Sequence, residues 1–113
     1  MVGVIPNTEG ICLMIAQVFD ERGENSDSFI DEAVEWCADN GARVINMSLG
    51  TTVSHKESKE LYNKLWEEGI IVVAAAGNSG SSVKAYPASY DDVISVSAVD
   101  ELNELAVFSS FNK

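Results

Sequence analysis

The most constraining feature of the sequence is an apolar run that ends in glycine and asparagine, GIIVVAAAGNSG at 69–80. Its first half is continuous and rich in β-branched residues, which is typical of a strand buried on both faces of a helix-covered parallel sheet. Its second half is small, and Gly77 allows the backbone to approach a ligand closely. Asn78 then places a neutral amide donor at the carboxyl end of the strand, where ligands bind in open α/β sheets. The same residues also fit a buried strand followed by an ordinary Gly/Asn turn, so both interpretations stay open at this point.

Length and composition predict a single domain with a substantial hydrophobic core. The chain has 113 residues, of which 46% are hydrophobic, and a formal net charge of −11. This charge argues against nucleic acid and anionic membrane surfaces as partners. No apolar run is long enough to cross a membrane, and residues 1–3 lack the basic start of a signal peptide, so we expect neither. Cys12 and Cys37 follow no metal-binding spacing and are interpreted as small buried hydrophobic residues.

Hydrophobic patterns along the chain predict four strands. They are expected at 11–19, 44–49, 69–76 and 93–99, and the first is mostly apolar and therefore central. Because strands alternate with helices, the crossovers should be right-handed and the sheet mostly parallel. The expected fold class is α/β, a three-layer unit with a mostly parallel sheet of about four strands and helices on its faces.

Two helices are expected between these strands. The first covers about 28–40, with Ser26 and Ser28 as candidate N-cap residues. The second begins at a capping box, Ser54 to Glu57, and ends at Gly69. Apolar residues at helical spacing mark the faces expected to pack on the core: Ile30, Ala33, Val34 and Cys37 in the first helix, and Leu61, Tyr62, Leu65 and Trp66 in the second.

The ends of two neighbouring strands predict one narrow cleft. Residues 48–50 end one strand as 76–78 end the next, and both ends are small and contain glycine. Exposed backbone at 48–50 could also pair with an extended peptide. A phosphate-binding loop at 77–80 is a weaker interpretation, because the loop lacks a lysine and does not clearly open a helix. His55, the single histidine, is expected to be a solvated helix residue rather than a base.

Taken in order, these motifs resemble the middle of a subtilisin-like serine protease, a subtilase. The matching segments are VINMSLG at 44–50, GIIVVAAAGN at 69–78, YPA at 86–88, VISVSAVD at 93–100 and FSSF at 108–111. Each motif is moderately specific; together, with the right gaps, they are highly specific and cover nearly the whole chain. The resemblance implies that residues 1–113 are one partial subtilase catalytic domain. The family hydrolyses peptide bonds with an Asp-His-Ser triad.

The resemblance implies roles for two groups of residues at the expected cleft. Asn78 matches the asparagine whose amide holds the oxyanion of the tetrahedral intermediate. The segment Ser48, Leu49 and Gly50 matches the part that pairs with substrate backbone and forms one wall of the primary specificity pocket. The other wall matches Ala75, Ala76 and Gly77. Thr51 stands where a glycine is common in the family.

A cation site is also implied by the resemblance. The Tyr86–Pro87 peptide bond is expected to be cis, and an aromatic residue before proline itself favours the cis form. The backbone carbonyls of Ala88, Tyr90 and Val93 are then expected to hold a weakly bound calcium ion or monovalent cation. No cofactor is expected to be required. The plain alternative is a trans turn that binds no ion.

The family's catalytic triad finds no match in the sequence. The residues that could be mistaken for it do not occupy triad positions: Asp20, Asp91, Asp100, His55, Ser79 and Ser109. We therefore expect a central fragment of a serine endopeptidase that is inactive alone, with a peptide or protein as the substrate of the whole parent and secretion as the family habit. One alternative is a catalytically dead subtilase-like module that binds peptides or proteins. Another is a free-standing flavodoxin-like domain whose 77–80 loop takes an anion.

A strand that the family places between 11–19 and 44–49 also finds no match. A gap in a sheet leaves backbone groups unpaired, and exposed edges favour self-pairing. Either 11–19 pairs directly with 44–49, or a second copy of the chain fills the gap. We therefore expect a homo-oligomer, most simply a two-fold dimer.

Overall fold

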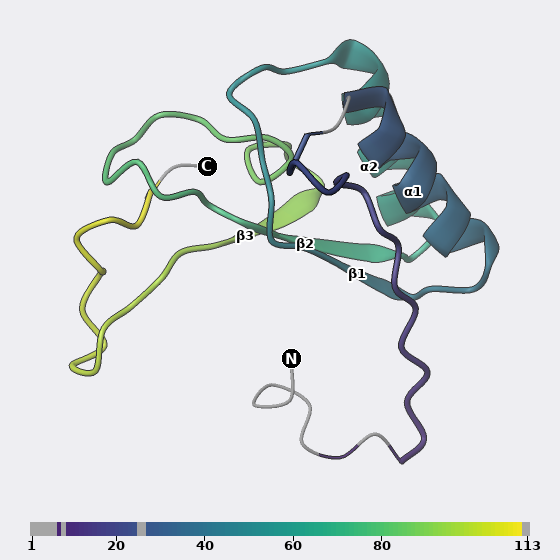
Figure 1. The fold of residues 1–113 in the computed structure, drawn as a ribbon, viewed down its shortest axis with the longest axis horizontal. Coiled ribbons are helices and arrows are strands. Elements are labelled where there is room, and N and C mark those ends of the chain that lie inside the picture. Colours follow the sequence, from purple (N-terminus) through teal and green to yellow (C-terminus); the bar gives the residue numbers. More distant parts are fainter. Residues whose placement is uncertain (1–6, 8, 25–26, 112–113) are drawn as a thin grey trace.

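The computed structural model describes residues 7, 9–24 and 27–111, and these form a three-stranded parallel sheet with two helices. The elements follow in the order α1 (Asp27–Asp39), β1 (Val44–Met47), α2 (Lys56–Glu67), β2 (Ile71–Ala75) and β3 (Val93–Val96). The strands lie in the order β1-β2-β3, and both pairs are parallel. Figure 1 shows α1 and α2 side by side over the sheet. The α/β class and the parallel sheet are confirmed, with three strands rather than four.

The segment 11–19, predicted as a central strand, is not a strand. Among the described residues it has no sheet partner, and in Figure 1 it lies outside the sheet as an extended purple trace. Its side chains alternate: Ile15 is 80% exposed, whereas Ala16 packs against the core. The prediction failed because it rested on apolar composition alone. A strand also needs a neighbouring backbone edge with free hydrogen-bonding groups.

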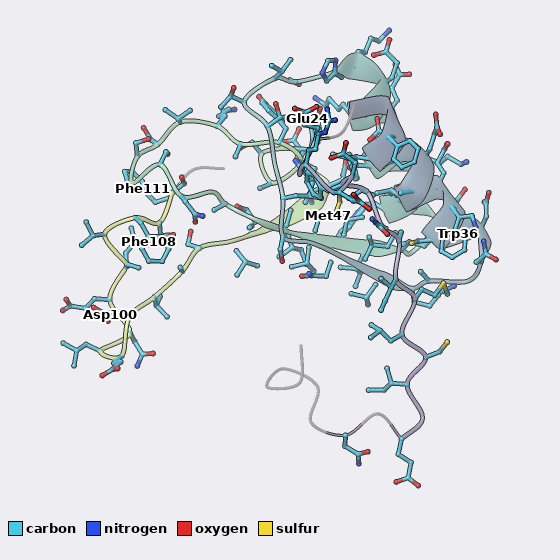
Figure 2. All side chains as sticks on the ribbon, viewed as in Figure 1. Glu24, Trp36, Met47, Asp100, Phe108 and Phe111 are labelled. Atoms are coloured by element: carbon cyan, nitrogen blue, oxygen red, sulfur yellow. The ribbon has the colours of Figure 1, made fainter. Side chains whose placement is uncertain are left out.

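One face of the sheet carries the core. The register aligns Ile45, Val72 and Val93 in a row across the three strands, and all three are buried. The helices pack on this row and on the residues beside it, and Figure 2 shows Met47 between sheet and helices. The main cluster consists of Val34, Cys37, Ile45, Met47, Tyr62, Leu65, Ile70, Val72, Ala74, Ala88, Tyr90 and Val93. Burial on this face accounts for the position of both helices, because each turns one apolar stripe inward.

The opposite face of the sheet is apolar but exposed. Val44 is 62% exposed, and Ile71, Ile94 and Val96 are exposed as well. The prediction that the run at 69–76 is buried on both faces is therefore wrong for the described residues, and so is the prediction of helices on both faces. A continuous apolar run indicates that both faces of a strand are apolar, but it does not say which segments cover the second face.

The helix boundaries agree with the sequence to within a few residues, but two details differ. The N-cap of α2 is His55 with φ −113° and ψ 138°, and no side chain caps this end, so the capping box at Ser54 is wrong. The backbone N–H of His55 instead donates to the Tyr90 hydroxyl at 3.0 Å, and that hydroxyl donates to the His55 carbonyl at 3.1 Å. For α1, Ser26 and the side chain of Ser28 lie outside the described residues.

Three side chains test the predicted core. Cys37 is buried, as expected, but Cys12 is exposed because it lies on the open side of the 11–19 segment; both thiols are free. Trp66 is 50% exposed and does not belong to the core, whereas Tyr62 and Leu65 do. The apolar stripe of α2 is therefore narrower than the sequence suggests.

Candidate active site

The strand end at 75–78 is built by close packing of small residues. The backbone N–H of Ala76 donates to the Val96 carbonyl at 2.9 Å, and this alanine is almost fully buried. Gly77 follows with φ +108°, a conformation that residues with a Cβ rarely adopt. The chain turns there, so the next side chain, Asn78, is exposed. The local sequence thus ends the strand and places an amide at its carboxyl edge.

A cavity of about 310 Å³ lies between the ends of β1 and β2. It brings together most of the residues that the sequence predicted for a cleft. Its lining consists of Ser48, Leu49, Gly50, Thr51, Thr52, Ala75, Gly77, Asn78, Ser79, Val83, Lys84, Ala85 and Ser110. Ala76, a predicted wall residue, does not line it, because its side chain is buried beneath the strand end. Ser110 and the 83–85 segment were not predicted.

The amide of Asn78 has the features of a hydrogen-bond donor available to a ligand. Its side chain is exposed at the cavity and makes no hydrogen bond to any described residue. A neutral amide can donate to an oxygen that gains negative charge without changing its own protonation state. The plain alternative, in which this amide caps its own turn, is not what the structure shows.

The opposite wall of the cavity is held by an antiparallel bridge between Thr51 and Tyr86. The Thr51 N–H donates to the Tyr86 carbonyl at 2.9 Å, and the Tyr86 N–H donates to the Thr51 carbonyl at 2.8 Å. A Cβ built on Gly50 would lie 3.0 Å from the Tyr86 carbonyl oxygen. This is tighter than ordinary van der Waals contact, so glycine at this position favours the close approach of the wall to 85–86.

A second cavity, of about 230 Å³, adjoins the first and shares Leu49, Gly50 and Thr51 with it. Its lining includes several aromatic side chains, with Tyr90 stacked on Tyr62 at a centroid distance of 5.5 Å. Its other lining residues are Phe19, Ile30, Asp31, Val53, His55, Ser58, Tyr86 and Pro87. The wall formed by 49–51 thus separates two hollows on the same side of the molecule.

Two polar groups lie in the lining of the second cavity. The Ser58 hydroxyl donates to the Asp31 carboxylate at 2.6 Å and so joins α2 to α1. Burial raises the pKa of the Tyr62 phenol, and the negative charge of Asp31 raises it further. The phenol therefore stays neutral through the physiological range and acts as a polar wall rather than as an acid or base.

The Tyr86–Pro87 bond is cis, as expected. The carbonyls predicted to bind a cation belong to Ala88, Tyr90 and Val93, which are all buried. The Tyr90 carbonyl already accepts the Val93 N–H at 3.3 Å. Within the described ranges, no group of three or more His, Cys, Asp or Glu residues could hold a metal ion. The cation site stays a prediction.

Two aspartates excluded from the triad have structural roles. Asp20 accepts the N–H groups of Arg22 and Glu24 through one carboxylate oxygen, at 2.8 and 2.9 Å. Asp100 does the same for Leu102 and Glu104, at 2.8 and 3.0 Å, at the tip of the loop labelled in Figure 2. Both carboxylates therefore close local turns.

Comparison with known proteins identifies relatives of the chain. A model of the subtilase family matches residues 1–113. The chain is 44% identical to "Subtilisin DY" from Bacillus licheniformis, covering 97% of this chain and 40% of that protein. It is 42% identical to a "Thermophilic serine proteinase" from Bacillus sp. (strain AK1), covering 96% of this chain and 26% of the relative. It therefore spans well under half the length of these relatives.

A solved structure agrees with the sequence match. The psychrophilic subtilisin-like protease Apa1 from the Antarctic psychrotroph Pseudoalteromonas sp. AS-11 superposes with a TM-score of 0.79 at 40% identity, covering 85% of this chain and 22% of that one. No helix in the described part of the chain is long and apolar enough to cross a membrane. The flavodoxin-like alternative is wrong, because the family match covers all 113 residues. The chain belongs to the subtilase family.

Proposed function

We propose that these 113 residues supply one oxyanion donor and the substrate-binding walls of a serine endopeptidase, whose substrates are peptides and proteins. One observation carries the proposal: in a subtilase chain, the exposed Asn78 amide faces a cavity whose other wall is the 48–51 strand end. During attack on a peptide carbonyl, the oxygen gains negative charge, and a fixed amide donor stabilises that charge.

The walls suit an extended peptide. The backbone of 48–50 continues from the edge strand β1, and no other described backbone group pairs with Leu49 or Gly50. An extended substrate backbone can therefore add alongside this segment by the hydrogen bonds of a sheet. The small residues Ala75 and Gly77 keep the facing wall open beside the scissile bond.

The catalytic triad belongs, in this proposal, to residues outside these 113. The single histidine, His55, is engaged at the start of α2 through its own backbone, and the chain spans only 26% and 40% of two relatives named above. The chain by itself should therefore not hydrolyse peptides, because loss of triad residues already lowers turnover by orders of magnitude. Secretion, the family habit, is part of the same proposal, tested by assaying culture fluid for the whole protein.

A peptide titration tests the substrate-binding half of the proposal. The ¹⁵N-labelled chain is titrated with an extended, uncleaved peptide while amide signals are followed. Signals of Leu49, Gly50 and the Asn78 side chain should shift together, and those of the Asp100 turn should not. Shifts confined to other surfaces would contradict the proposal. A quenched protein substrate incubated with the same sample should stay uncleaved.

A second candidate function is a catalytically dead module that only binds peptides. The unpaired backbone at 48–50 favours it equally, because binding by strand addition needs no triad. The full-length natural protein distinguishes the two: hydrolysis that a serine-directed phosphonate abolishes supports the endopeptidase, and peptide binding without hydrolysis supports the module.

A further inference from the structure

We propose that Ser110 is a positioning residue for the Asn78 amide, an inference that rests on the oxyanion role proposed above. Ser110 comes from the last described segment of the chain, far from β2 in sequence. It is 1% exposed and lines the same cavity as Asn78. It contacts the residues on both sides of Asn78, although no hydrogen bond joins it to Asn78 itself.

The backbone and the hydroxyl of Ser110 hold the two neighbours of Asn78. The Ser110 N–H donates to the Gly77 carbonyl at 2.9 Å. Its hydroxyl oxygen accepts the Ser79 N–H at 3.2 Å and lies 2.9 Å from the Ser79 hydroxyl. The peptide groups before and after Asn78 are therefore fixed by one buried residue, which limits the directions in which the amide can point.

The hydroxyl groups form a connected chain, in which either oxygen of each O–H···O pair can be the donor. Because Ser110 Oγ accepts the Ser79 N–H, its own proton is available to the Ser79 hydroxyl, 2.9 Å away. The Ser79 hydroxyl can then donate to Ser81 Oγ at 2.8 Å, which also accepts the Val83 N–H. In this order the Ser110 and Ser79 hydroxyls each donate and accept one bond, and Ser81 Oγ accepts two, so the 77–81 loop is tied by side chains as well as by backbone.

Further contacts anchor the segment that carries Ser110. The Ser97 hydroxyl donates to the Ser110 carbonyl at 2.8 Å, and the Gly80 N–H donates to the Phe108 carbonyl at 2.8 Å. In Figure 2, Phe108 and Phe111 mark this segment beside the loop that follows β2. The loop at 77–81 is thus held beside the end of β3 through the 108–111 segment, in which Ser110 contacts both the loop and Ser97.

The neighbouring residue Ser109 is a matched control. It is as buried as Ser110 and also carries a bonded hydroxyl. However, its Oγ accepts the Ala98 N–H at 2.8 Å and donates to the Ser110 carbonyl at 3.1 Å, so it does not touch the 77–81 loop. Removing either hydroxyl deletes one oxygen from a buried site. Only the Ser110 deletion releases Ser79, the residue that follows Asn78, while the backbone bond from the Ser110 N–H to Gly77 stays in place.

The test is a double-mutant cycle in the full-length natural protein with a peptide substrate. Ser110→Ala should lower kcat by about fivefold to tenfold, the effect of one lost hydrogen bond, with little change in KM. In an Asn78→Ala background the same substitution should have almost no effect, because the group that it positions is gone. Ser109→Ala should leave kcat unchanged. Ser110→Cys keeps the volume but accepts hydrogen bonds weakly, so it should resemble Ser110→Ala.

The outcomes separate this inference from the proposed function. If Asn78→Ala does not lower kcat, the oxyanion role itself is wrong. If Asn78→Ala lowers kcat but Ser110→Ala costs the same factor in both backgrounds, or if Ser109→Ala matches it, the positioning role is wrong. Full activity in Ser110→Cys would also overturn it. If the Ser110 variants do not fold, Ser79→Ala removes the 2.9 Å hydroxyl contact with Ser110 from an exposed residue but keeps the Ser79 N–H bond to Ser110 Oγ. Its kcat should therefore fall by a smaller factor, and unchanged kcat there would overturn the inference.

Discussion

Gly77 is the residue on which the shape of the 77–81 loop depends most. Its φ of +108° is strained for any residue with a Cβ, and a Cβ there would lie 3.1 Å from Ser110 Oγ. Gly23 also has a positive φ, +76°, but a Cβ there meets nothing within 4 Å. Comparing substitutions at the two glycines therefore separates the cost of backbone strain from the cost of steric contact with Ser110.

Substitution of Gly77 by alanine should lower the free energy of unfolding by about 2–3 kcal/mol, because strain and displacement of Ser110 add. Gly23→Ala should cost only about 1 kcal/mol, from strain alone. Urea unfolding of the 113-residue chain measures both values. Equal losses would show that contact with Ser110 contributes nothing.

Tyr62 predicts how stability depends on alkaline pH. Burial first, and then the charge of Asp31, raises the pKa of its phenol above the ordinary 10.0. Above about pH 10 the unfolded state therefore loses this proton while the folded state keeps it. The contribution of this phenol to the free energy of unfolding should be fully present below about pH 10 and should be lost as the pH rises further. Tyr62→Phe should flatten that fall in urea melts; an unchanged slope would contradict the assignment.

At the scale of elements, the sequence predicted the helices and strands that depend on local pattern. It did not predict the features that depend on contacts with segments far away in the sequence. The β2 run is a continuous apolar signal and the apolar stripe of α2 is a periodic one, and both elements formed where expected. The 11–19 segment has strand composition, but its pairing depends on a neighbour that local pattern cannot supply. Asn78 was predicted at the cleft because its motif is contiguous, and it lines the cavity. Ser110, which also lines the cavity, was not predicted because its contact with Ser79 joins residues 31 apart in the sequence, and only the fold brings them together.

The contact between α1 and α2 gives a prediction at the same scale. Ser58 is buried and donates to Asp31 at 2.6 Å, so Ser58→Ala should lower the free energy of unfolding by about 1.5–3 kcal/mol, the range for a hydrogen bond to a charged group. Ser54→Ala should have no measurable effect, because His55 rather than Ser54 begins α2. Thermal or urea unfolding compares the two. A larger loss of stability in Ser54→Ala than in Ser58→Ala would contradict this assignment and support a capping box at Ser54.

At the scale of the whole molecule, the sheet has an open edge and an open face. Among the described residues, β1 has a partner on one side only, and Val44, Ile71, Ile94 and Val96 leave an apolar surface opposite the helices. Such surfaces favour association. The alternative in which 11–19 closes the sheet is not what the structure shows, so we propose that the isolated chain associates with a second copy through β1.

Sedimentation equilibrium at micromolar concentration tests that proposal. The 12.2 kDa chain should sediment as a dimer, and Val44→Lys should shift it toward monomer by placing a charge on the apolar face. Leu102→Lys changes an exposed leucine in the Asp100 turn, away from the sheet, and should leave the chain a dimer. A monomeric wild-type chain would contradict the proposal.

The turnover of Asn78→Ala in the full-length natural protein tests the central claim most directly. The claim is that this amide stabilises the oxyanion, so kcat should fall by about 100- to 1,000-fold with little change in KM; this magnitude is the one measured for such a donor in a subtilase. Asn63→Ala is the matched control, because Asn63 is an exposed asparagine on α2 that contacts Asp92. Its kcat should equal that of the wild type. Equal kcat values for Asn78→Ala and Asn63→Ala would contradict the account.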